Sequence, residues 1–178
     1  MKKFRPLSPP ASHYLSAAVG WLGLGSCADA AAELAHLPAR LQGHPDVLEV
    51  KWQINAQQNQ WEIALEIARR LLEVEPSRPS GWLHQSYSLR RVPQGTLNQA
   101  MQALLPAAEK FPGEPTIPYN LSCYACQLHD LKAARRWLKR AERVAGKGPV
   151  KQLALADPDL EPLWEELRGG SLDPMALE

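Results

Sequence analysis

Residues Trp61 to Pro76 read WEIALEIARRLLEVEP, and this stretch decides the fold. Ala64, Ala68 and Leu71 within it follow the spacing i, i+4 and i+7, which places all three on one face of an α-helix. Pro76 cannot continue a helix, because it has no backbone N–H to donate. The stretch therefore predicts a helix with one apolar face that ends before Pro76.

The same pattern occurs four times along the chain. The alanines that begin it are 34, 36 and 34 residues apart, at Ala30, Ala64, Ala100 and Ala134. Apolar residues follow at i+4 (Leu34, Ala68, Leu104, Leu138) and at i+7 (Leu37, Leu71, Ala107, Ala141). Five residues before each alanine stand Gly25, Asn59, Gly95 and His129, residue types that suit a tight turn with a positive φ. The chain is thus predicted to repeat a helix–turn–helix unit.

Each predicted turn is preceded by another helical stretch. Ala18, Ser86 and Ser122 occupy one equivalent place in three of these first helices, where small side chains allow two helices to approach closely. Trp52 occupies that place in the second unit. The third unit is two residues longer than the others, and the extra length falls near Val92-Pro93, where proline ends the first helix early.

A 34-residue period, with small residues where helices cross and proline after the second helix, resembles the tetratricopeptide repeat family. The closest stretches are Trp61–Pro76 and Tyr119–Ala141, although the family's usual Leu-Gly pair is absent from every unit. The resemblance implies an all-α fold, a right-handed α-solenoid of antiparallel helix hairpins. It also implies a concave wall, built mostly by the first helices, that binds peptides.

The predicted organisation has four parts. Residues 1–11 form an N-terminal extension, 12–147 four TPR-like hairpins, 148–168 C-terminal capping helices and 169–178 a disordered tail. Asp157-Pro158 is a helix N-cap followed by proline, and an apolar stripe comes after it at Leu160, Leu163, Trp164 and Leu167. Such a cap is expected, because the last hairpin of an open array would otherwise expose its apolar face.

The composition is that of an ordinary soluble protein, with 45% hydrophobic and 22% charged residues and a net charge of +1. No membrane span is predicted. Residues 131–151 carry eight basic residues and one acid, whereas residues 156–178 carry seven acids and one arginine. Docking of the acidic cap beside the basic helix explains this pattern. The alternatives are an acidic protein partner and nucleic acid, the latter disfavoured because no aromatic stacking platform lies among the basic residues.

By its register, the resemblance places eight candidate binding residues on the concave wall: Leu83, Tyr87, Arg90, Arg91, Tyr119, Cys123, Gln53 and Gln57. The tyrosines can bury large rigid surfaces, and the arginines can bind a carboxylate through charge-assisted hydrogen bonds. The alternative is that the tyrosines only pack between hairpins while the arginines are solvated.

Cys123 and Cys126, with His129 three residues further on, raise the question of a metal site. Helical geometry puts His129 in a turn, where it does not close a tetrahedron with the two sulfurs, and no second Cys/His pair is spaced to complete one. The sequence therefore predicts no metal and no cofactor. It also contains no catalytic motif, so neither enzymatic activity nor a small-molecule substrate is expected.

These observations predict a cytoplasmic adaptor or scaffold that binds a peptide or protein segment. The alternative is an exported, lipid-anchored repeat protein working in envelope assembly, because Leu24-Gly25-Ser26-Cys27 resembles a lipoprotein cleavage box with Cys27 as the lipidated residue. A polar, proline-containing stretch separates this box from the basic N-terminus, unlike a compact export signal. Three cysteines, an odd number, favour a reducing compartment.

Overall fold

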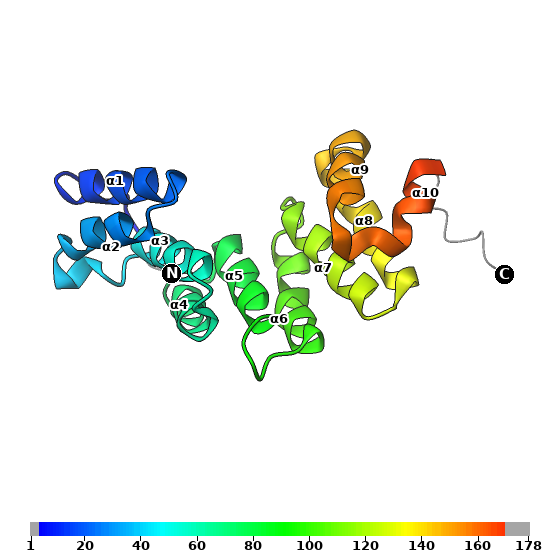
Figure 1. Ribbon diagram of the computed structural model, residues 1–178, viewed down its shortest axis with the longest axis horizontal. Coiled ribbons are helices and arrows are strands. Elements are labelled where there is room, and N and C mark those ends of the chain that lie inside the picture. Colours follow the sequence, from blue (N-terminus) through cyan, green and yellow to red (C-terminus); the bar gives the residue numbers. More distant parts are fainter. Residues whose placement is uncertain (1–3, 170–178) are drawn as a thin grey trace. The chain divides into compact units, whose positions relative to one another are not determined.

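A computed structural model describes residues 4–169 of the chain, so the predicted tail lies outside the described residues beyond Gly169. Within the described range the chain forms α-helices and short 3-10 helices, and no β-strand (Figure 1). The elements are α1 (Ala11–Gly23), α2 (Cys27–Ala35), η1 (Ala39–Leu41), α3 (Pro45–Gln57), α4 (Trp61–Val74), α5 (Pro79–Leu89), α6 (Leu97–Lys110), α7 (Thr116–Gln127), α8 (Leu131–Ala145), α9 (Lys147–Ala156), η2 (Pro158–Leu163) and α10 (Trp164–Gly169). The predicted all-α fold is confirmed.

The helices belong to two compact units, which we call the N-terminal unit (Met1–Gln94) and the C-terminal unit (Gly95–Glu178). The division falls between α5 and α6, beside Val92-Pro93, where the sequence placed the extra length of the third repeat. Helix α5 ends at Leu89, as the following proline led us to expect. Each unit is described by itself below.

The repeated alanine face is the core of both units. The predicted positions are all at most 4% exposed, including Leu37, which lies just beyond the end of α2: Ala30, Leu34, Leu37, Ala64, Ala68, Leu71, Ala100, Leu104, Ala107, Ala134, Leu138 and Ala141. Burial of these apolar side chains is the main favourable term that holds the hairpins together.

Three of the four predicted turns have the left-handed backbone that their residue types suit. The φ angles are +80° at Gly25, +57° at Asn59 and +62° at His129. The turn at Gly95 is completed differently, by a capping box at the start of α6. There the Gln99 N–H donates to Thr96 Oγ1 over 3.1 Å, and the Thr96 N–H donates to Gln99 Oε1 over 3.0 Å.

In the N-terminal unit, α1 packs on α2, α3 on α4, and α4 on α5. Helix α1 contributes Ala18 and Leu22 to a core shared with Val47 and Ile54 of α3. Helices α4 and α5 meet at Gly81, where an added Cβ would lie 3.1 Å from Leu72 Cδ2. This close contact fixes α5, which carries several of the candidate binding residues.

In the C-terminal unit, α7 is the central element and packs against α6, α8 and η2. The small residue Ser122 lies at the α7–α8 crossing, where its Oγ donates to the Ala134 carbonyl over 2.8 Å. The segment after α9 covers the same helix, with Leu160, Leu163 and Leu167 all buried as the stripe predicted.

One expectation for the cap is corrected by the structure. Asp157 does cap the segment that follows, accepting from the Asp159 N–H over 3.0 Å, but Pro158–Leu163 is a 3-10 helix instead of the first turns of one α-helix. Pro162 lies inside it and lacks the N–H that an α-helical bond requires. The α-helical part begins only at Trp164.

Among the helices of the described residues, none combines the length and the apolar character needed to cross a membrane.

Candidate functional site

The eight predicted binding residues are divided between the two units. Gln53 and Gln57 lie on α3, Leu83 and Tyr87 on α5, and Arg90 and Arg91 directly after α5, all in the N-terminal unit. Tyr119 and Cys123 lie on α7 in the C-terminal unit. The two groups are therefore treated separately.

The N-terminal group includes an aromatic cluster that links α3 and α5. The rings of Trp52 and His84 stack with centroids 3.7 Å apart and planes 9° from parallel. Tyr87 meets Trp52 edge to face, with centroids 6.0 Å apart, and meets Trp61 of α4 at 5.9 Å. Tyr87 is 37% exposed, so solvent reaches part of this cluster at Tyr87.

The guanidinium of Arg91 completes the cluster. Its Cζ lies 3.4 Å from the centroid of Tyr87 and 5.1 Å from that of Trp61, within cation–π range of both rings. Its Nη1 donates to the carbonyl of Tyr87 over 3.1 Å. We call Trp52, Trp61, His84, Tyr87 and Arg91 the aromatic surface.

Glu49 holds the aromatic surface from beneath. Its carboxylate lies 2.6 Å from His84 Nε2, accepts a hydrogen bond from Ser80 and faces Arg78 at 3.6 Å. Burial alone would raise the pKa of Glu49, but the hydrogen bonds from His84 and Ser80 and the nearby positive charges outweigh it, so its pKa is lowered. The ionised carboxylate thus fixes the ring of His84 under Trp52.

A second hydrogen bond fixes Trp52 itself. Its Nε1–H donates to the hydroxyl of the buried residue Ser88 over 3.0 Å. The stacked pair is therefore anchored at both ends, and the rings of Trp52 and His84 are held in place.

The remaining predicted residues of this unit differ in their exposure. Gln53 and Gln57 are exposed one helical turn apart on α3, whereas Leu83 and Arg90 are half-buried. The Cys27 thiol donates to Gln57 Oε1 over 3.2 Å. Cys27 is the first residue of α2, and cleavage before it would remove all of α1 from the core described above.

Tyr119 and Cys123 do not lie on an open wall. They are only 9% and 3% exposed. The Tyr119 hydroxyl donates to Asp157 Oδ2 over 2.9 Å, and the Cys123 sulfur lies 3.5 Å from the same oxygen. Burial, the neighbouring Cys123 and the hydrogen bond to Asp157 raise the pKa of Tyr119. Both residues therefore contact the cap segment through Asp157 and expose little of their surface.

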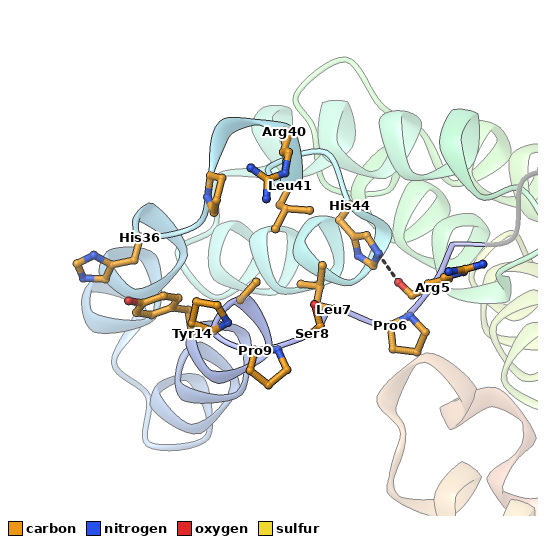
Figure 2. Close-up of a pocket in the computed structure, with 13 residues that line it drawn as sticks. Arg5, Pro6, Leu7, Ser8, Pro9, Tyr14, His36, Arg40, Leu41 and His44 are labelled. Atoms are coloured by element: carbon orange, nitrogen blue, oxygen red, sulfur yellow. Dashed lines mark hydrogen bonds between the residues drawn. The ribbon is translucent and has the colours of Figure 1, made fainter.

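The N-terminal unit contains a pocket of about 440 Å³ that was not predicted from the sequence. Figure 2 shows the segment from Arg5 to Pro9 along one side of it and Arg40, Leu41 and His44 along the other. His44 Nε2 lies 3.0 Å from the Arg5 carbonyl and holds the segment in place. Residues 1–11 were predicted to form an N-terminal extension. The three prolines Pro6, Pro9 and Pro10 were the signal in the sequence for an ordered backbone there.

The ionisable side chains among the described residues that line this pocket are all basic or phenolic: Arg5, Tyr14, His36, Arg40 and His44. Tyr14 and His36 stack with centroids 5.1 Å apart. The volume is in the usual range for ligand pockets. Such a lining suits an anionic group better than a cation.

The basic helix α8 is partly neutralised within its own unit. Arg135 donates to both carboxylate oxygens of Glu166 in α10, with Nε at 2.7 Å from Oε2. Arg140 instead binds Glu109 of α6 over 2.7 Å. Lys132, Arg136 and Arg143 are exposed. The acidic cap therefore pairs with part of the basic helix and leaves part of it at the surface.

No protein-family model matches the chain, and no curated protein matches it either. Solved structures of MamA, a TPR-like protein, do match its fold. A structure of MamA residues 41 to the end from Desulfovibrio magneticus RS-1 superposes with a TM-score of 0.65 at 14% identity, covering 92% of this chain and 94% of that one. A MamA RS-1 double mutant gives a TM-score of 0.64 at 15% identity, covering 94% of this chain and 100% of that one. At this identity the similarity establishes the TPR-like all-α fold alone.

Proposed function

We propose that this chain is a protein-interaction module that binds an extended peptide segment on the aromatic surface of its N-terminal unit. The observation that carries the proposal is the side chain of Tyr87, a residue that is 37% exposed, packs against Trp52 and Trp61, and has the Arg91 guanidinium over its ring. Tyr, Trp and Arg are the residue types enriched among the energetically dominant residues of protein interfaces. The TPR-like fold supports a scaffold role of this kind.

The geometry suggests how a peptide would be held. An apolar or aromatic side chain of the peptide can cover the free part of the Tyr87 ring, while a peptide carboxylate can approach the Arg91 guanidinium. Gln53 and Gln57, exposed on α3, can hydrogen-bond to the backbone of the peptide. The binding residues in this proposal are Tyr87, Arg91, Gln53 and Gln57, whereas Tyr119 and Cys123 are left out because they are buried.

The test is to select peptides from a random library with the intact chain and to measure their dissociation constants by fluorescence anisotropy. We expect the double variant Tyr87→Ala, Arg91→Ala to bind at least about tenfold more weakly, as expected for an interface hot spot. The matched control is Ile63→Ala, Arg69→Ala, which changes an exposed apolar residue and an exposed arginine on α4 of the same unit. Equal affinities for both double variants, with both folded, would contradict the proposal.

A second candidate function is binding of an anionic ligand in the pocket beneath residues 5–10, favoured by its basic lining. Citrate and inorganic phosphate are suitable probes, with thermal unfolding as the readout. We expect either anion to raise the unfolding temperature of the wild type and to have a smaller effect on Arg40→Ala, whose side chain lines the pocket. No stabilisation, or the same stabilisation of both proteins, rejects this candidate.

A further inference from the structure

The C-terminal unit brings together two pairs of potential metal ligands that are far apart in the sequence. Cys123 and Cys126 lie one turn apart on α7, and Asp157 and Asp159 lie at the start of η2. One ligand atom from each of Cys123, Asp157 and Asp159 lies within 4.8 Å of the other two. The two aspartates lie more than 30 positions after Cys123, so no local spacing of cysteine and histidine in the sequence indicates this cluster.

The aspartates are held in place by the fold. Asp157 Oδ1 accepts from the Asp159 N–H over 3.0 Å, and Asp157 Oδ2 accepts from the Tyr119 hydroxyl over 2.9 Å. Gln127 Nε2 donates to the Asp159 carbonyl over 3.0 Å and so ties η2 to the end of α7. Hydrogen bonds of this kind, made to the residues that would bind a metal, orient ligands in known metal sites.

The charges around the cluster favour a cation. Glu166 and Arg135 also lie near it, but both Glu166 carboxylate oxygens accept hydrogen bonds from the Arg135 guanidinium, which offsets its charge. The carboxylates of Asp157 and Asp159 each bring an oxygen within 4.8 Å of the Cys123 sulfur. Their negative charge would attract a metal ion, and the thiol proton would leave as the ion binds.

We propose that Cys123, Asp157 and Asp159 bind a divalent metal ion of the zinc class. Zinc accepts sulfur and carboxylate ligands together in tetrahedral sites, whereas magnesium and calcium take oxygen ligands alone. Cys123 releases its thiol proton to solvent when it binds the ion, so the ion replaces one proton. The site would fasten the C-terminal cap to α7.

The test uses cobalt(II) chloride as an optical probe on the reduced, full-length chain. A tetrahedral site with thiolate ligands gives a sulfur-to-cobalt charge-transfer band in the near ultraviolet and intense visible bands. We expect both sets of bands at one equivalent of cobalt, and their loss on addition of one equivalent of zinc. Cys123→Ser should abolish the charge-transfer band or reduce it several-fold.

Asp159→Asn is the decisive variant. The hydrogen bonds that Asp159 makes to Asp157 and Gln127 use its backbone, so this substitution removes a carboxylate ligand and keeps both of them. Removing an outer-shell partner typically weakens metal binding about 10- to 100-fold, so we expect loss of a direct ligand to weaken it at least about 100-fold. Cys27→Ala is the matched control, because Cys27 lies in the N-terminal unit. Absence of the bands in the wild type, their dependence on Cys27, or their full retention in Asp159→Asn with an unchanged affinity would each overturn the proposal.

Discussion

Tyr87 and Tyr119 both lie on first helices and both were predicted to line a binding groove, yet they differ in exposure and in hydrogen bonding. Tyr87 is 37% exposed, with a guanidinium over its ring, whereas Tyr119 is 9% exposed and donates its hydroxyl to Asp157. In the C-terminal unit the chain continues past the last hairpin and folds back over α7. The difference shows that the repeat register decides which face a residue occupies, while the segments that follow decide whether that face is open.

The largest expected effect comes from breaking the cap that buries Tyr119. Leu163 is fully buried, so Leu163→Ala should destabilise the C-terminal unit by about 3 kcal/mol, the cost of the lost burial and of the cavity left behind. Hydrogen exchange measured by mass spectrometry should show faster exchange in α7 and in residues 157–169, with α1–α4 unchanged. A loss below about 1 kcal/mol would mean that the cap contributes little to the burial of Tyr119.

The next largest effect tests the support under Tyr87. Trp52→Ala removes the ring stacked on His84 and the Nε1–H that donates to the buried Ser88 hydroxyl. We therefore expect the free energy of unfolding, measured with urea, to fall by about 2 kcal/mol. Trp21→Ala, at a tryptophan that is 38% exposed on α1, is the matched control and should cost less than about 1 kcal/mol. Equal losses from the two substitutions would show that the aromatic surface is not rigidly anchored.

Removing one hydroxyl compares the two tyrosines directly. Tyr119→Phe deletes the hydrogen bond to Asp157 in a buried setting and should cost about 1 kcal/mol. Tyr87→Phe keeps the ring and its contact with Arg91, so its effect should stay within about 0.5 kcal/mol. Chemical denaturation of the two variants measures the difference, and a reversal of this order would contradict the contrast in burial.

The smallest effect concerns pH. The pKa of Glu49 is lowered below its usual 4.5 in the folded chain, so the folded state favours the ionised carboxylate. The resulting stability is present above pH 4.5 and is lost as the pH falls through the lower, folded-state value. Glu49→Gln lacks this contribution. As the pH falls below 4.5, the free energy of unfolding of the variant should therefore decrease by about 0.5 kcal/mol less than that of the wild type. Parallel pH profiles of the unfolding temperature for wild type and variant would refute this assignment.

Much of the fold could be predicted because it depends on short-range periodicity. The spacing that begins at Ala30, Ala64, Ala100 and Ala134 identifies the buried face of the second helix in each hairpin, since helical geometry fixes which side chains share a face. Gly25 and Asn59 marked turns for a similar local reason. The 3-10 form of Pro158–Leu163 was missed because a stripe of leucines fits either kind of helix, and the effect of Pro162 was not considered.

The candidate site was harder to predict, because it depends on contacts between distant residues. Tyr87 and Arg91, four positions apart in the sequence, lie in contact, but the stacking of Trp52 on His84 joins residues 32 positions apart and leaves no mark in the sequence pattern. The burial of Cys123 by Asp157, 34 positions later, is of the same kind. The pocket beside residues 5–10 was not predicted, because this segment has no helical periodicity in its sequence.

The accessibility of Tyr87 can be measured on the native chain by tyrosine nitration followed by peptide mapping. We predict that Tyr87 is nitrated, that Tyr119 and the fully buried Tyr124 are not, and that a bound library-selected peptide protects Tyr87. Nitration of Tyr119 as fast as Tyr87, or undiminished nitration of Tyr87 under a saturating peptide, would contradict the account.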